Sequence, residues 1–280
     1  MAKELYKNIL QRLPAALILA ICLSGILYLQ NIILIFIVIL AVGFLLFKEW
    51  LILSESKIDF KQIIFFVTLI MLPIFFTESF FELFIGIISI FWFAYSICLI
   101  LKITPSYISF QNNYLGAFLV MGFLYGLIYL ILFSEFVGIN KYFLLFVILF
   151  NTILADVGAY LIGSSFGKTP LLQEISPNKT IEGFVGGIVF VLVFLLVIYF
   201  YNFISLDLIV AALFSLPFAF IGDYFESQLK RDKSIKDSGS LIPGHGGLFD
   251  RVDGLLPAAT ALWLGSFWFS EKSFLLWTKV

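Results

Sequence analysis

Charged residues are scarce in this chain of 280 residues: they make up only 12% of it, and hydrophobic residues make up 62%. Soluble domains carry about 25% charged residues, so this composition argues against a soluble globular protein and favours one embedded in a membrane. Histidine occurs once and cysteine twice, at Cys22 and Cys98 within apolar runs. So few imidazole and thiolate ligands argue against a zinc site, and the two separated cysteines do not indicate a disulfide framework.

Long apolar runs fill most of the chain, and nine of them are long enough to cross, or nearly cross, a bilayer. They are predicted at 13–29, 31–47, 63–77, 80–101, 114–133, 142–162, 183–201, 206–225 and 249–269. The predicted fold class is therefore all-α, a polytopic membrane bundle of nine transmembrane helices. No internal repeat or linker divides it. We expect a single membrane domain over 1–280, in which 1–133 form a scaffold and 142–280 carry the functional site.

The basic residues predict the orientation of these spans. With the N-terminus in the cytoplasm, 14 of the 17 Lys and Arg residues fall on the cytoplasmic side and three on the other. Because cytoplasmic loops are enriched in basic residues, the polar loops 163–182 and 226–248 are expected to face the cytoplasm. Lys3, Lys7 and Arg12 alternate with apolar residues, which predicts an amphipathic helix on the membrane surface. A cleavable signal peptide is the alternative for this segment.

Asp156 is an unusual residue for the sixth predicted span. It lies in the cytoplasmic half of that span and shares a helix face with Tyr160 and Gly163. A carboxylate at that depth is costly, so Asp156 is a candidate functional residue. The alternative is a carboxylate that pairs with a neighbouring helix for packing.

The segment from Ser176 to Gly183 joins the sixth and seventh predicted spans. Asn178 or Thr180 is expected to cap the seventh helix, whose first N–H groups, together with Lys179, would bind phosphate. An ordinary cap before a helix that packs through its glycines is the alternative.

The densest polar stretch runs from Ser227 to Asp253, and it holds five of the 17 Lys and Arg residues and the only His. If the eighth helix continues past its apolar part, Asp223 shares one face with Ser227, Lys230 and Arg231.

A glycine-rich loop follows this helix and leads to two further carboxylates. Lys236 and Asp237 come first, and then glycines surround His245. Their backbone N–H groups can form a nest for an anion. Asp250 and Asp253 follow at spacing i, i+3, which would place both on one face of the last span.

These residue types indicate one kind of chemistry. Carboxylates without histidine or cysteine partners suit Mg²⁺ better than zinc or copper, and Mg²⁺ held in this way usually shares its ligand shell with substrate phosphates. The neighbouring cations would bind the same phosphates, so the pattern predicts phosphoryl or nucleotidyl transfer. A solvated basic loop is the alternative, but it does not account for four Asp residues beside membrane spans.

The polar stretch resembles the signature motif of the CDP-diacylglycerol synthases, or phosphatidate cytidylyltransferases. The shared pattern is Ser227-x-Leu-Lys230-Arg231, four residues, Lys236-Asp237-x-Gly239-x-x-Ile242-Pro243-x-His245-Gly246-Gly247-Leu248-x-Asp250-Arg251-Val252-Asp253. A second stretch of resemblance is Asp156-x-Gly158-Ala159-Tyr160-x-x-Gly163 followed by Ser176-Pro177-x-Lys179-Thr180-x-Glu182-Gly183. The resemblance covers 150–257, whereas the first 140 residues share only the span pattern and the basic start.

The resemblance implies an enzyme that transfers CMP from CTP to phosphatidic acid. The products would be CDP-diacylglycerol and pyrophosphate for phospholipid biosynthesis, and the reaction would use Mg²⁺ and often K⁺. It also implies a homodimer in a bacterial inner membrane, with membrane lipid as a partner, no nucleic acid and an active site that faces the cytoplasm.

The resemblance also implies roles for individual residues. Metal ligands would be Asp223 and Asp253, then Asp250 and Asp237. Phosphate ligands would be Lys230, Arg231, Lys236 and Arg251, and the same cavity would be lined by Asp156, Lys179, Glu182, Ser227, Gly246 and Gly247. His245 would be a positioning residue, because a phosphomonoester is already ionised at about pH 7 and needs no strong base.

Two other functions fit parts of the pattern. A CTP-dependent polyprenol or phytol kinase resembles this family distantly and would transfer the γ-phosphoryl group, but its motif lacks the His-Gly-Gly-x-x-Asp-Arg-x-Asp ending. A transporter of an anionic lipid or solute is expected to have repeats and broken helices with polar groups near the midplane, and this sequence has no visible repeat.

Overall fold

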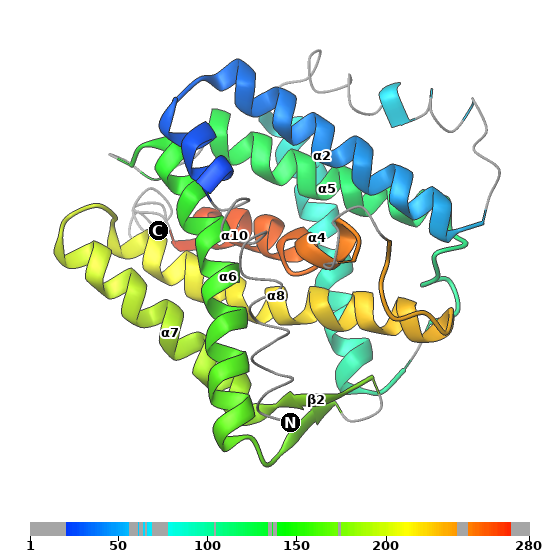
Figure 1. The fold of residues 1–280 in the computed structure, drawn as a ribbon. Helices are drawn as coiled ribbons and strands as arrows, with labels where there is room; N and C mark the ends of the chain where they lie inside the picture. Colours follow the sequence, from blue (N-terminus) through cyan, green and yellow to red (C-terminus); the bar gives the residue numbers. More distant parts are fainter. Residues whose placement is uncertain are drawn as a thin grey trace, which may run out of the picture.

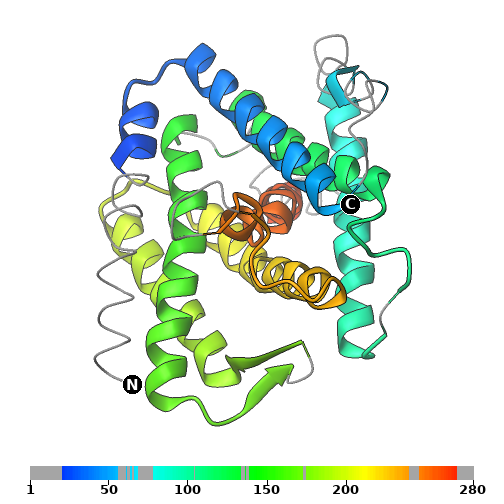
Figure 2. The same cartoon turned by 45° about the vertical axis from the view of Figure 1, so that its right-hand side comes forward.

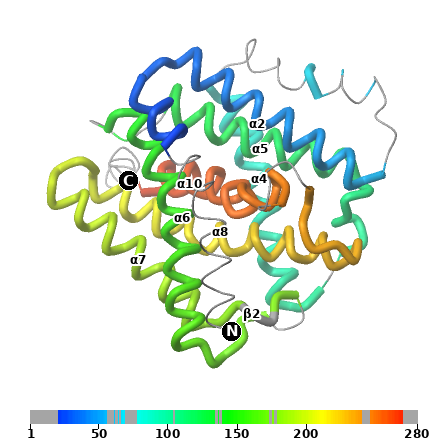
Figure 3. Tube along the Cα trace, viewed as in Figure 1, coloured from blue at the N-terminus to red at the C-terminus, as the bar shows by residue number. Residues whose placement is uncertain are grey.

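The computed structural model describes residues 21–55, 61, 64, 66–68, 78–103, 105–133, 136, 139–172, 175–239 and 246–269, apart from the side chains of Pro177 and Asn178. Figures 1 and 3 show that helices make up most of this part of the chain. The long helices are α2 (Ile32–Leu53), α4 (Glu78–Ile100), α5 (Asn113–Leu132), α6 (Lys141–Phe166), α7 (Ile181–Phe200) and α8 (Leu206–Asp232). Two shorter helices follow, α9 (Phe249–Val252) and α10 (Leu255–Phe269).

Six of the described helices, α2 and α4 to α8, are long and apolar enough to cross a membrane. They support the predicted class, a polytopic helical membrane protein. The number of nine spans and the cytoplasmic N-terminus stay predictions, because 13–20 and most of 63–77 lie outside the described residues.

The segment 249–269 forms two helices rather than the predicted single span, since α9 ends at Val252 and α10 begins at Leu255. Pro257 accounts for the break. Its ring has no N–H to donate, and in a continuous helix it would collide with the carbonyl of Asp253, four residues earlier.

Helix α5 forms the centre of the bundle. Every residue from Leu119 to Ile131 is buried, and α2, α4 and α10 pack around it. In the most apolar 18-residue segment of α5, 83% of the residues are buried, compared with 28% in that of α7 and 33% in those of α2, α4 and α6. Ile33, Ile37, Val189 and Val193 are exposed on these outer helices, as expected for side chains that face lipid.

Helices α6 and α7 pack closely against each other and carry a small β-hairpin at one end (Figure 1). The all-α prediction did not include this hairpin, in which β1 (Pro170–Leu172) pairs antiparallel with β2 (Ser176–Thr180). Thr180 caps α7, as predicted, by accepting a hydrogen bond from the Gly183 N–H at 3.1 Å. A Cβ at Gly183 would lie 2.8 Å from the Ala159 carbonyl oxygen, so the close α6–α7 contact requires glycine there.

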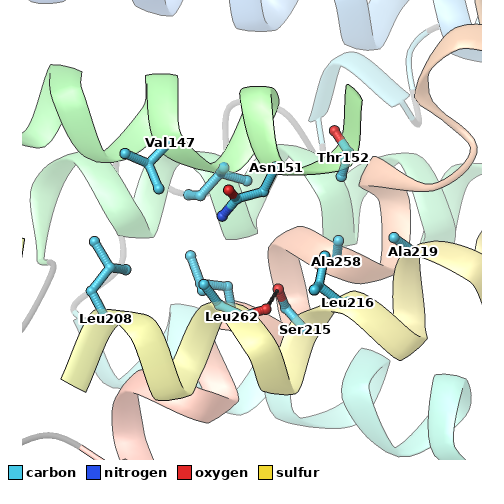
Figure 4. Close-up of a pocket in the computed structure, with 11 residues that line it drawn as sticks. Val147, Asn151, Thr152, Leu208, Ser215, Leu216, Ala219, Ala258 and Leu262 are labelled. Carbon is cyan, nitrogen blue, oxygen red and sulfur yellow. Dashed lines mark hydrogen bonds between the residues drawn. The ribbon is translucent and has the colours of Figure 1, made fainter. Parts of the chain in front are cut away.

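Helix α8 crosses the middle of the molecule and continues to Asp232, beyond the apolar part that ends at residue 225. Where α6, α8 and α10 meet, a cavity of about 10 Å³ remains between apolar side chains and the polar groups of Asn151, Thr152 and Ser215 (Figure 4). This volume matches about one water molecule. No carboxylate lines this cavity, so the acidic residues of interest lie elsewhere.

Candidate functional site

Three carboxylates meet where α8 passes the break between α9 and α10. Asp223 and Glu226 come from α8 and Asp253 from the break, and one oxygen from each lies within 4.8 Å of the others. Gly222 allows this approach, because a Cβ there would lie 2.2 Å from the carbonyl oxygen of Asp253. Like charges at this separation repel one another, so the carboxylate cluster Asp223–Glu226–Asp253 favours the binding of a cation.

Lys179 brings one positive charge to this cluster from strand β2. Its ammonium group forms an ion pair with Asp223 and lies 4.6 Å from the centre of the Tyr224 ring. The next residue, Thr180, caps α7, so the hairpin and the start of α7 together position the Lys179 side chain.

Asp156 approaches the same cluster from α6. Its charge interacts with those of Asp223, Asp253 and Lys179. The Asp156 side chain itself is exposed. The structure therefore brings together residues from α6, β2, α8 and the α9–α10 break.

Lys230 connects the carboxylate cluster to the loop after α8. Its Nζ donates hydrogen bonds of 2.8 Å to Glu226 Oε2 and to Asp250 Oδ1. Glu226 is only 1% exposed, and its Oε1 has no hydrogen-bond partner among the described residues. A buried carboxylate oxygen without a donor is costly, and a bound cation would compensate for it.

Asp250 is held by the loop and by Lys230. Its Oδ2 accepts hydrogen bonds from the Ser238 N–H at 2.9 Å and from the Gly247 N–H at 2.8 Å. The sequence predicted that glycine N–H groups of this loop would bind an external anion, but the Gly247 N–H already donates to the Asp250 carboxylate. Helix α9 ends between Asp250 and Asp253, and the two side chains take different partners.

Glu49, near the end of α2, holds the same loop from the other side. This carboxylate is 7% exposed and accepts hydrogen bonds from the Ser238 hydroxyl, from the Leu248 N–H at 2.7 Å and from the Phe249 N–H at 3.2 Å. It thus satisfies N–H groups at the start of α9 that would otherwise lack acceptors. Trp50, the next residue, packs on the Phe249 ring with centroids 5.6 Å apart.

Neither Glu49 nor Glu226 is among the residues predicted from the sequence. Glu49 is a carboxylate in a mostly apolar helix, which is the signal that identified Asp156. Glu226 lies one helical turn from Asp223 and from Lys230, on the face already considered functional.

The remaining predicted residues lie around this network. Arg231, Lys236, Asp237 and Arg251 are exposed, and Ser227 is half-buried. Gly246 lies next to Asp237, since a Cβ at Gly246 would be 3.4 Å from that of Asp237.

The last two predicted residues are Glu182 and His245. Glu182 accepts hydrogen bonds from the N–H groups of Lys168 at 3.1 Å and Thr169 at 3.2 Å, so it braces the connection from α6 to β1. His245 lies outside the described residues.

Comparison with known proteins adds a second line of evidence. The model of a cytidylyltransferase family matches residues 10–269. The phosphatidate cytidylyltransferase of Aquifex aeolicus is 35% identical over 204 residues, which cover 73% of this chain and 72% of that protein. Those of Bacillus subtilis and Mycobacterium bovis are each 43% identical over 42% of this chain, and the matches span only 44% and 40% of their lengths.

Proposed function

This chain belongs to the cytidylyltransferase family, and we propose that it transfers CMP from CTP to phosphatidic acid, giving CDP-diacylglycerol and pyrophosphate for phospholipid biosynthesis. The observation that carries the proposal is the cluster Asp223–Glu226–Asp253 beside Lys179. Anionic ligands for a metal and a cation for a phosphate occur together there, in a chain whose relatives are named for this reaction.

We propose that Asp223, Glu226 and Asp253 hold Mg²⁺. Their hard oxygen donors and the unpartnered Glu226 Oε1 fit this ion, which supplies positive charge against the phosphates of the nucleotide. Of the other predicted ligands, Asp250 bonds to Lys230 and the loop, and Asp237 is exposed. We therefore favour Glu226 as the third ligand, and K⁺ stays in the proposal without assigned residues.

The chain's own residues would bind and orient the two substrates. Lys179, Arg231, Lys236 and Arg251 carry the positive charges expected to bind phosphate groups. A phosphate oxygen of the lipid forms a bond to the α-phosphorus of CTP, and the bond from that phosphorus to the bridging oxygen breaks, so pyrophosphate leaves. No side chain has to remove a proton, because the phosphomonoester is ionised at about pH 7, and His245 is proposed to position the substrates.

We further propose that the protein lies in a bacterial inner membrane as a homodimer, with this site facing the cytoplasm. The basic bias of the loops supports the orientation. CTP is a cytoplasmic nucleotide, and phosphatidic acid reaches the site from the bilayer.

The test uses purified protein, phosphatidic acid in detergent and CTP labelled at either the α- or the γ-phosphorus. We expect the α-label to appear in the lipid and the γ-label in pyrophosphate. A γ-label in the lipid would identify a CTP-dependent lipid kinase instead. If neither label reaches the lipid, while vesicles containing the protein carry an anionic solute across the membrane, the enzyme proposal is wrong.

A further inference from the structure

A second cavity, of about 500 Å³, lies between the C-terminal end of α8, the end of α4 and the β1–β2 hairpin. Figure 2 shows the course of α4, α8 and the hairpin in the chain. The cavity's apolar lining comes from α4, the residue Ile103 after it and the hairpin. The polar lining residues are Lys102, Gln228, Arg231 and Asp232, of which the last three come from α8. None of the carboxylate cluster lines this cavity, but that cluster lies earlier on the same helix, and the hairpin also carries Lys179.

Gln228 presents hydrogen-bond donors to this cavity. It is only 4% exposed, and its Oε1 accepts a hydrogen bond from the Tyr95 hydroxyl at 2.8 Å. This bond fixes the amide group, and in the described part of the chain its nitrogen has no acceptor. Because a buried amide nitrogen carries two N–H donors, it is a strong candidate to bind an acceptor on a ligand.

Asp232 presents an acceptor to the same cavity. It lies four residues after Gln228, so both share one face of α8, about 6 Å apart along the helix axis. The Asp232 carboxylate is exposed and has no hydrogen-bond or ion-pair partner among the residues described. A paired donor and acceptor beside apolar walls suit a flat, polar ring.

We infer that this cavity binds the cytosine base of the nucleotide, with Asp232 accepting from the 4-amino group and Gln228 donating to the ring N3 or O2. A carboxylate that accepts from the cytosine 4-amino group is a recurrent pairing in base recognition. Uracil carries an oxygen at that position, so it would place two acceptors against each other. Arg231 also lines the cavity and carries a positive charge that the phosphates require. The inference rests on the proposed function, because it names how the nucleotide of that reaction is selected.

The experiment compares CTP with UTP as the nucleotide in the transfer to phosphatidic acid. Asp232→Asn replaces an acceptor oxygen by an amide that can donate to the uracil oxygen. We expect the ratio of kcat/KM for CTP to that for UTP to fall at least about tenfold, mainly through a higher KM for CTP. Gln228→Glu keeps the acceptor for Tyr95 but removes the donors, and it should also raise the KM for CTP.

The matched control is Asp207→Asn, at the opposite end of α8, which should keep the wild-type ratio. If Asp232→Asn lowered kcat/KM equally for CTP and UTP, or left both unchanged, the ratio would not change and the proposed base site would be wrong. The proposed function would still stand, because the wild-type protein would transfer CMP. If the wild-type protein transferred no CMP, both the proposed function and this inference would fail.

Discussion

Glu226 joins the carboxylate cluster to Lys230. One of its oxygens accepts the Lys230 hydrogen bond, and the other is buried without a donor in the described part of the chain. Lys230 offsets part of the negative charge of Glu226 and Asp250. The cluster Asp223–Glu226–Asp253 still carries more negative charge than Lys230 offsets, and this excess is available to a metal ion. If this arrangement binds Mg²⁺, the charge of each residue matters more than its size.

The first prediction is that Asp223→Asn, Asp253→Asn and Glu226→Gln each lower CMP transfer about a hundredfold or more. Each change keeps the volume of the side chain and removes the charge, so the loss is electrostatic and is large in a site that excludes water. Raising the Mg²⁺ concentration should restore part of the rate. The measurement is the initial rate as a function of Mg²⁺ concentration.

Lys233→Ala is the control for this series. Lys233 pairs with the exposed Glu55 at 2.7 Å, a hydrogen bond that holds the pKa of Glu55 below its ordinary value. Exposed ion pairs contribute little, so Lys233→Ala should keep most of the activity. If Asp253→Asn kept normal activity at low Mg²⁺ while Lys233→Ala lost activity, the metal assignment would be wrong, and the basic residues rather than the carboxylates would form the site.

The second prediction concerns Asp156, which approaches the cluster from α6. Asp156→Asn should lower kcat at least about tenfold, which corresponds to about 1.4 kcal/mol, while the protein still inserts into the membrane. The rate is measured on protein purified from the membrane fraction, so that folding and activity are read separately. Wild-type activity in this variant would assign Asp156 to packing.

At the residue scale, sequence reasoning identified Asp223 and Asp253 but not their third partner. Spacing along one helix predicts which residues share a face, and it placed Asp223 and Lys230 on the same face of α8. Spacing does not predict which residues of other helices and loops contact that face. Glu49 shows the limit most clearly, because the Ser238 hydroxyl that it binds is 189 positions away in the sequence.

At the scale of secondary structure, α2 and α9 hold the loop after α8 between them. Glu49 joins the end of α2 to the first N–H groups of α9, and Ser238 joins both to Asp250. The loop therefore has fixed attachments on each side of residues 240–245. Such attachments set where Asp250 lies, and through Lys230 they influence Glu226.

The third prediction is that Glu49→Gln destabilises the folded protein by about 1–3 kcal/mol, because one of its acceptor oxygens becomes a donor that faces backbone N–H groups. We expect a lower Tm in detergent and a lower rate of CMP transfer. Glu55→Gln, a few residues later and exposed, is the matched control and should change neither quantity. An unchanged Tm in Glu49→Gln would show that the loop is held by other contacts.

The apolar patterns predicted α4, α5, α6 and α7 to within four residues at each end, whereas α2 continues six residues beyond the predicted end at residue 47. They could not predict the β1–β2 hairpin, whose strands of three and five residues are too short for a periodic pattern. The break in 249–269 had a visible cause in Pro257, but an apolar run does not show whether proline bends a helix or ends it. The hairpin carries Lys179 and the break carries Asp253, so the least predictable elements contribute two residues of the candidate site.

At the scale of the whole molecule, the orientation in the membrane decides whether CTP can reach the cluster. The distribution of basic residues predicts that the loop after α8 lies in the cytoplasm and the turn between α7 and α8 on the other side. Both positions offer exposed residues, Ser234 in the loop and Asn202 in the turn. Ser238 is unsuitable as a reporter because it is only 3% exposed and binds Glu49.

The fourth prediction is that Ser234→Cys and Asn202→Cys react from opposite sides of the membrane. In a background that lacks Cys22 and Cys98, a membrane-impermeant maleimide added to intact cells should label Asn202→Cys and leave Ser234→Cys unlabelled. Permeabilising the cells should expose Ser234→Cys, which also serves as the control that the thiol is reactive. Because α8 alone lies between the two positions, labelling of both from the same side would mean that α8 does not cross the bilayer, and the carboxylate cluster would then need a different route to its nucleotide.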